Sequence, residues 1–123
     1  MTRFWIATAA IGGFLSVAAG AVAAHLTASD ARAAELLRTG ALYGMVHAAA
    51  LLAVAAMAEP RGRPDLLLAI AGWSFAAGLL LFSLSLFALA LTGAERFGLV
   101  TPFGGASLLI GWAALGVRAL RRR

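Results

Sequence analysis

The stretch Leu66–Thr92, which reads LLLAIAGWSFAAGLLLFSLSLFALALT, contains no charged residue from its first position to its last. A helix needs about 20 consecutive apolar residues to cross the hydrocarbon core of a membrane, and this stretch is long enough. Three further uncharged stretches can be considered as spans. The sequence therefore predicts a single transmembrane domain over residues 1–123, with spans at about residues 4–26, 40–58, 66–92 and 102–118.

The composition supports a membrane protein of the all-α class. Hydrophobic residues make up 63% of the chain and charged residues 12%, whereas soluble domains average about 25% charged residues. The chain has no cysteine, which excludes a disulfide framework and a thiolate metal site. We expect one antiparallel four-helix bundle that binds no nucleic acid, because the charges lie in the segments between the spans.

The arginines predict the orientation of the spans. All ten basic residues are arginine, and cytoplasmic segments carry an excess of basic residues. With four alternating spans, the side that holds both termini carries most of them, namely Arg3, Arg61, Arg63, Arg118, Arg121, Arg122 and Arg123. Both termini are therefore expected in the cytoplasm, where Arg118, Arg121, Arg122 and Arg123 would contact the headgroups of anionic lipids.

Two connectors contain signals for the start of a helix. Ser29 or Asp30 can cap a short amphipathic helix that extends to Arg38, and we expect this helix to lie in the plane of the outer interface. Thr101 can act as the N-cap of the fourth span, with Pro102 at the first helical position. Both connectors are expected on the side opposite the termini.

Each predicted span carries small residues at helical spacing. In lipid, helices associate through close approach of their backbones and through interhelical hydrogen bonds, and small residues permit both. The four rows together favour a compact bundle with short antiparallel connections. From the first span to the fourth they are Gly12, Ser16, Gly20 and Ala24; Gly40, Gly44 and Ala48; Ser74 and Gly78; and Gly104, Ser107, Gly111 and Ala114.

Polar side chains concentrate in the predicted outer half of the bundle, away from the termini. Tyr43 and His47 lie one helical turn apart, and helical rise places them about 5 and 10 Å below an outer boundary at Gly40. A titratable group at membrane depth is a candidate functional residue, because hydrocarbon offers it no hydrogen-bond partner. The other candidates in this cluster are Ser83, Ser85, Thr101, Ser107 and His25, the last at the outer end of the first span.

Two interpretations of the polar cluster are open. Tyr43 and His47 can hydrogen-bond to serine hydroxyls or carbonyl groups of neighbouring spans and so set the helix register. Alternatively, they form a ligand or proton site that opens to the outer face, where a histidine can change its charge. Ligation of a metal or haem is disfavoured, since His25 and His47 differ in depth by about 10 Å and no carboxylate lies within a span. No catalytic residue, metal or cofactor is predicted.

Several motifs occur in a fixed order along the chain. They are Gly20–Leu26, Thr39-Gly40 with Tyr43 and His47-Ala48, Leu81–Phe87 with Leu89–Leu91, Thr101–Gly105, and Gly111-Trp112. In this order they resemble the YgdD/YwdK family of small four-span membrane proteins. The resemblance implies a bacterial inner-membrane protein of a family whose function is unknown. The sequence differs from the pattern of the family that it resembles at Gly44, where a glutamine is usual, and at Leu84, where a glycine is usual.

These observations favour a non-enzymatic membrane protein, either an accessory or scaffold protein or a lipid-binding protein, with the polar cluster around His47 as its site. The expected partners are membrane lipids, a second copy of the chain or a larger membrane complex. One alternative function is an oligomeric carrier or channel for a small solute. Another is a membrane cofactor binder that uses Tyr43 and His47.

Overall fold

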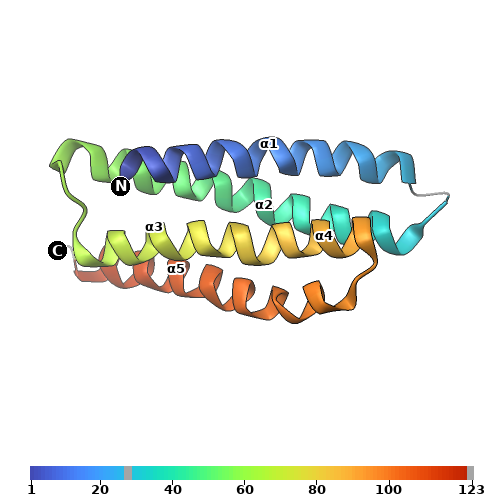
Figure 1. Cartoon of the computed structure of the whole chain (residues 1–123). Coiled ribbons are helices and arrows are strands. Elements are labelled where there is room, and N and C mark those ends of the chain that lie inside the picture. The colour runs from blue at the N-terminus through green and yellow to red at the C-terminus, as the bar shows by residue number, and fades with distance from the viewer. Residues whose placement is uncertain (27–28, 122–123) are drawn as a thin grey trace.

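In the computed structural model, long helical segments lie side by side and antiparallel (Figure 1). The structure describes residues 1–26 and 29–121, apart from the side chain of Arg61. The N-terminus and the end of the last helix lie at the same end of the bundle (Figure 1). In chain order, the elements are α1 (Thr2–Leu26), α2 (Ala31–Ala58), the 3-10 helix η1 (Glu59–Arg61), α3 (Leu66–Gly78), the π-helix η2 (Leu79–Ser83), α4 (Leu84–Thr92), the 3-10 helix η3 (Glu95–Leu99) and α5 (Thr101–Arg121).

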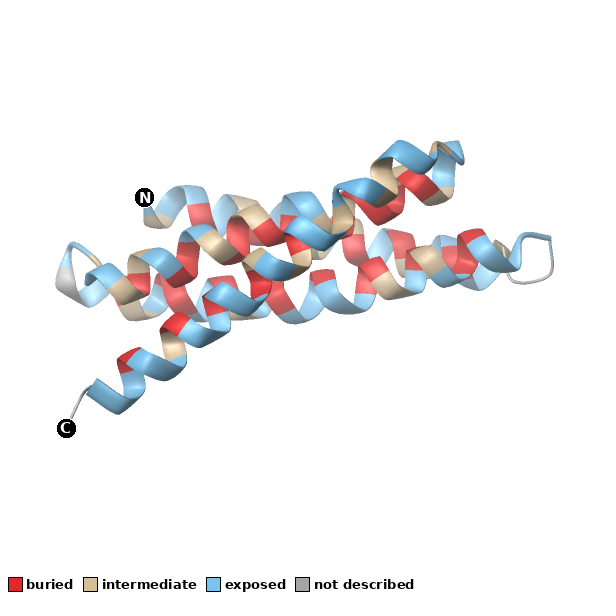
Figure 2. Ribbon diagram, turned by 90° about the horizontal axis from the view of Figure 1, so that it is seen from below, coloured by how far each residue is buried: buried red, intermediate tan, exposed pale blue. Residues whose placement is uncertain are grey.

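Every regular element in the described part of the chain is helical, which confirms the all-α class. Four segments of this part are long and apolar enough to cross a membrane, namely Thr2–Leu26, Ala31–Ala58, Leu66–Thr92 and Glu95–Arg121. Figure 2 shows buried residues along the inward faces of these segments, while the outward faces expose large apolar side chains such as Phe14 and Leu109. Apolar surface of this extent is typical of contact with lipid. The predicted four-span bundle is confirmed.

The second span is longer than predicted because the expected amphipathic helix is part of it. Helix α2 runs without interruption from Ala31 to Ala58, so no separate helix lies in the interface plane. Asp30, one of the two predicted N-cap candidates, is the N-cap of α2. Its carboxylate accepts a hydrogen bond from the Ala33 amide. The predicted break at Gly40 does not occur. Gly40 lies inside the helix and packs against Phe87. The ring of Phe87 would lie 2.6 Å from a Cβ added at Gly40.

The third span has the predicted limits but contains an unpredicted π-turn. Between Leu79 and Ser83 the helix is wider than an α-helix. A π-turn contains one residue more than a turn of α-helix. The inner part of the span, α3, packs mainly against α5, and the outer part, α4, packs mainly against α2. The π-turn therefore lies where the span changes its packing partner.

The fourth span begins one residue earlier than predicted. The carbonyl of Val100 accepts hydrogen bonds from the amides of Phe103 and Gly104, so Val100 is the N-cap and Thr101 is the first helical residue. Thr101 therefore does not cap α5. Its hydroxyl lies 2.7 Å from the Ser85 hydroxyl and 3.4 Å from the Phe97 carbonyl oxygen instead. Thr101 thus joins the fourth span to the third through side chains.

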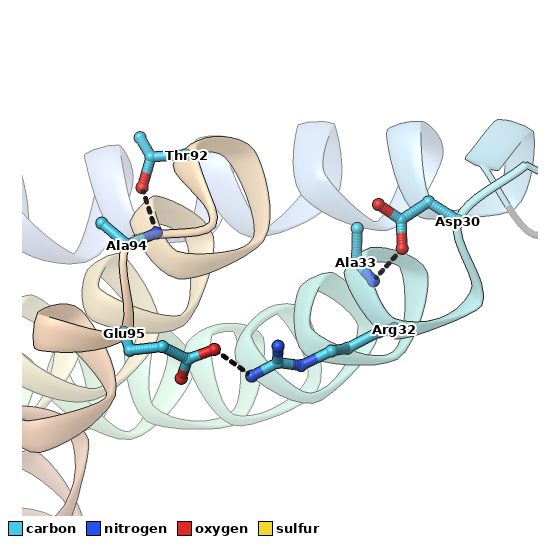
Figure 3. A network of polar contacts seen from close by, with 6 residues as sticks. All are labelled: Asp30, Arg32, Ala33, Thr92, Ala94 and Glu95. Atoms are coloured by element: carbon cyan, nitrogen blue, oxygen red, sulfur yellow. Dashed lines mark hydrogen bonds and ion pairs between the residues drawn. The ribbon is translucent and has the colours of Figure 1, made fainter.

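The end of the bundle opposite the termini, which is the predicted outer end, is closed by short polar contacts between connectors. Arg32, in the first turn of α2, forms an ion pair with Glu95 at 2.8 Å, and both side chains are largely exposed (Figure 3). In the same region, the Thr92 hydroxyl accepts a hydrogen bond from the Ala94 amide where the chain turns towards η3 (Figure 3). An exposed ion pair contributes little to stability. These contacts fix the positions of the connectors, whereas the packing of the spans stabilises the bundle.

Candidate functional site

His47 is buried and hydrogen-bonded at both ring nitrogens. Its Nε2 lies 2.9 Å from Nε1 of Trp112, and its Nδ1 lies 2.7 Å from the carbonyl oxygen of Tyr43. An indole N–H can only donate, so Nε2 of His47 must accept. The proton of the neutral imidazole is then on Nδ1 and is donated to the Tyr43 carbonyl. Trp112 therefore selects one tautomer of His47 and joins α5 to α2.

Aromatic rings surround His47. The centroid of its ring lies 5.7 Å from that of Phe75, 6.0 Å from that of Trp112 and 6.1 Å from that of Tyr43. The Tyr43 ring is parallel to the imidazole, and its centroid lies 4.9 Å from that of Phe82. Edge and offset contacts of this kind add to the stabilisation that burial itself provides. The imidazole is thus fixed in orientation as well as in tautomer.

A groove of about 410 Å³ opens beside this cluster, between α2 and α5. Tyr43 and Trp112 are about half exposed along it, while His47 is almost fully covered. Gly105 contributes no side chain, which leaves space above the ring of Phe82. The residues that line the groove are Tyr43, His47, Phe82, Gly105, Leu108, Leu109 and Trp112.

His47 lies near the middle of the length of the bundle. Gly40 packs against Phe87, and Phe87 lies five residues before the end of α4 at Thr92. Gly40 is therefore about 8 Å along the bundle from that end of α4. His47 follows Gly40 by two helical turns, about 10 Å. The site therefore lies well inside the bundle.

The predicted serines form no hydrogen bond with His47 and are hydrogen-bonded to other groups. Ser83 donates to the Gly40 carbonyl at 2.9 Å, and Ser107 donates to the Ser74 carbonyl at 2.8 Å. Ser85 donates to the carbonyl of Phe82 at 2.9 Å and also contacts Thr101. Except for the bond from Ser85 to Phe82, each of these contacts joins two spans. The serines therefore form interhelical hydrogen bonds, as the structural interpretation of the cluster expects.

Ser16 is a buried hydroxyl that has no hydrogen-bond partner among the described residues. It faces Gly44 of α2, where an added Cβ would lie 2.0 Å from the Ser16 oxygen. The missing side chain at Gly44 thus makes room for this hydroxyl between α1 and α2. The absence of a side chain at Gly44 therefore has a local packing consequence.

Arg118, expected at the lipid headgroups, is buried and ion-paired. Its Nε donates to a carboxylate oxygen of Asp65 at 2.7 Å. Asp65 is also the N-cap of α3, where its other oxygen accepts from the Leu68 amide at 3.0 Å. The pair therefore joins the inner end of α5 to the start of α3. The further candidates Arg122 and Arg123 lie outside the described residues.

His25 does not belong to the site. It is exposed in the last turn of α1, at the outer end of the bundle. In the described part of the chain, no group of three His, Cys, Asp or Glu side chains is arranged to hold a metal ion. The structure therefore brings Tyr43 and His47 together with Trp112 and not with His25.

The sequence interpretation missed the role of Trp112. The motif Gly111-Trp112 was noted only as part of the family pattern, because a tryptophan in a span is usually an interfacial or packing residue. Its position near the middle of α5 is the signal that distinguishes it. A donor at that depth requires an acceptor, and His47 provides it.

Comparison with known proteins identifies the family. The family model described as "Protein of unknown function (DUF423)" matches residues 19–105. The inner membrane protein YgdD of Escherichia coli (UPF0382) is 38% identical over 128 residues, covering 98% of this chain and 92% of the relative. A UPF0382 membrane protein of Haemophilus influenzae is 37% identical, and YwdK of Bacillus subtilis is 33% identical. Each of these two alignments covers at least 97% of this chain and 98% of the relative.

No solved structure matches the chain. The relatives span its whole length and are named as membrane proteins, in E. coli as inner membrane proteins. The inner-membrane location expected from the sequence is therefore confirmed. The chain belongs to this family of membrane proteins of unknown function.

Proposed function

We propose that this protein is a non-enzymatic membrane protein that binds a lipid-soluble ligand in the groove between α2 and α5. The observation that carries the proposal is the groove itself, which places the half-exposed phenol of Tyr43 beside apolar walls near the middle of the span. Hydrocarbon cannot satisfy a phenol hydroxyl, so a ligand with a hydrogen-bonding group is favoured there over an acyl chain alone.

The size and lining of the groove define the class of ligand. Its volume of about 410 Å³ falls in the range of about 300–1,000 Å³ that is typical of small-molecule sites. Leu108, Leu109 and Phe82 supply apolar contacts, and Tyr43 supplies one hydroxyl. A small amphiphile with an apolar body and one polar group therefore fits this site better than a helix of a second protein.

The chemistry of the groove supports a binding role over catalysis. Both nitrogens of His47 are engaged in hydrogen bonds, so the imidazole is not available as a general base while Trp112 stays in place. Among the described residues, no carboxylate, serine or threonine lines the groove.

The distribution of arginines supports an orientation with both termini in the cytoplasm.

Native mass spectrometry of protein purified from bacterial membranes tests the proposal. Gly105→Leu should fill the groove, because Gly105 has open space on its groove side and the nearest ring atoms lie 3.7 Å from an added Cβ. Gly116→Leu is the matched control in the same helix, since nothing lies within 4 Å of a Cβ added there. We expect a bound small molecule in the wild type and in Gly116→Leu, and its loss in Gly105→Leu.

Three other outcomes would contradict this function. Equal binding in both variants would exclude the groove as the site. A dimer that only Gly105→Leu disrupts would identify a second copy of the chain as the occupant. Solute flux through liposomes that the same variant abolishes would favour the carrier alternative. Thermal unfolding of each variant shows whether the bundle is intact.

A further inference from the structure

The inner end of the bundle holds a charged donor without an acceptor. The side chain of Arg118 is 10% exposed, and its Nε is bonded to Asp65. Its Nη2 is buried and has no hydrogen-bond partner among the described residues. Leaving a buried donor unpaired is unfavourable, and more so when the group is charged. The arrangement is therefore stabilised by any acceptor that reaches Nη2.

A groove of about 390 Å³ lies at this position and is lined by Asp65, Leu66, Leu67, Arg118 and Arg121. Arg121 follows Arg118 by three residues, so both arginines lie on the same face of α5. Each carboxylate oxygen of Asp65 already accepts a hydrogen bond, one from Leu68 and one from Arg118. The two arginines and Asp65 together leave one net positive charge. The groove therefore suits an anion.

We propose that this groove binds the phosphate group of an anionic phospholipid. A phosphate oxygen would be the missing acceptor for Nη2 of Arg118, and the exposed guanidinium of Arg121 would contact a second oxygen. Guanidinium groups match phosphate in geometry as well as in charge. Leu66 and Leu67 supply apolar walls beside the arginines, and Leu66 is 76% exposed. Such walls suit the acyl chains of a lipid and offer nothing to a free phosphate ion.

This inference is independent of the proposed function. It concerns the end of the bundle that holds the termini, and it shares no residue with the groove beside His47. Failure of either proposal leaves the other intact.

The test measures binding of phosphatidylglycerol to the delipidated protein in detergent, with phosphatidylcholine and inorganic phosphate in parallel. Arg121→Gln retains the pair of Arg118 with Asp65, and we expect it to weaken phosphatidylglycerol binding by about five-fold or more. Arg63→Gln is the matched control: it removes the same charge from an exposed position in the inner connector, outside the groove. We expect it to have little effect.

Equal effects of the two variants would overturn the proposal, because they would indicate non-specific attraction between an arginine-rich end and an anionic surface. Inorganic phosphate that displaces the lipid at equal concentration would overturn the assignment to a phospholipid. Arg118→Lys provides a second variant, since it keeps a cation near Asp65 but removes the guanidinium donors. It should lose preference for phosphatidylglycerol while its unfolding temperature shows that the bundle is intact. Unchanged lipid preference in this variant would contradict the role of Nη2.

Discussion

The glycines of α5 and those of α1 lie in helix interfaces that differ in closeness. A Cβ added to Gly104 would lie 2.3 Å from the backbone nitrogen of Phe82, so the main chains of α5 and η2 are in direct contact. A Cβ added to Gly12 or Gly20 would meet side-chain atoms at 3.4 and 3.9 Å, which are ordinary contact distances. At Gly104 the fourth span is therefore packed backbone to backbone, whereas at Gly12 and Gly20 α1 is packed against side chains.

This difference shows where the bundle depends on glycine. In lipid, no hydrophobic force drives helices together, so close backbone approach contributes directly to association. At Gly104 the neighbour is main chain and cannot rotate away, whereas at Gly12 the neighbour is the flexible side chain of Leu79. The interface of α5 is therefore expected to tolerate substitution much less well than that of α1.

The largest effect is expected for Gly104→Ala. The new methyl group would displace the backbone of η2. Overpacking costs about 1–3 kcal/mol in the free energy of unfolding, and we expect the upper end of this range here because the neighbour is main chain. Gly116→Ala, in open space on the same helix, is the control. Reversible unfolding in detergent micelles measures both variants. Equal stability of the two would remove the distinction between close and loose interfaces.

Gly44→Ala tests a close contact between α1 and α2. The methyl group would collide with the Ser16 hydroxyl, so we expect a loss of about 1–3 kcal/mol in stability. The closest obstacle is the Ser16 side chain, and the Ser83 hydroxyl at 3.1 Å is the next, so Ser16→Gly combined with Gly44→Ala should restore most of this loss. A double variant that is as unstable as Gly44→Ala alone would mean that the two backbones themselves are too close.

Trp112→Phe should have an intermediate effect. It keeps an aromatic ring between α5 and α2 but removes the N–H that His47 accepts. Interhelical hydrogen bonds in membranes contribute about 0.6–1.7 kcal/mol, and we expect a loss of stability in that range. Trp73→Phe, at a half-exposed position on α3, is the control. The combined variant Trp112→Phe with His47→Phe should show less than additive loss, and strict additivity would mean that the bond contributes nothing.

The smallest effect is expected for Gly12→Ala and Gly20→Ala. Both sites have room for a methyl group, and alanine favours a helix more than glycine does. The change in the free energy of unfolding should be within about 0.5 kcal/mol and tend towards stabilisation. A large loss at either site would show that α1 is also held by direct backbone contact.

The sequence predicts the four spans and their order because each contains a long stretch without charged residues, and this pattern depends on no tertiary contact. The sequence does not show which of the small-residue rows lie in the closest helix contacts. Gly12 and Gly104 look alike in the sequence, and only the atoms opposite them distinguish their roles. Likewise, the sequence predicts that a span begins at Gly40, whereas Gly40 lies inside α2 and packs against Phe87.

The candidate site was predicted in part. Tyr43 and His47 stand out because they are polar groups in an apolar span, and this local property is visible in one helix. The partner of His47 lies 65 residues away in the sequence, so no local pattern joins them. The serines were placed with His47 on the basis of depth, whereas their bonds depend on which face of each span meets its neighbour. The π-turn in the third span has no signal in the run of leucines around it.

The π-turn at Leu79–Ser83 makes this point of the third span tolerant of a change in length. A π-turn contains one residue more than a turn of α-helix, so removing one of these five residues can return the span to a regular helix. The residues of α4 would then keep their direction relative to α3, and α4 would still pack against α2. A deletion inside α3 would instead rotate the residues that follow it by about 100°. A single-codon deletion at the π-turn should therefore be less damaging than one within α3, and a one-residue gap at this point in a related chain would indicate a regular third span with the same neighbours.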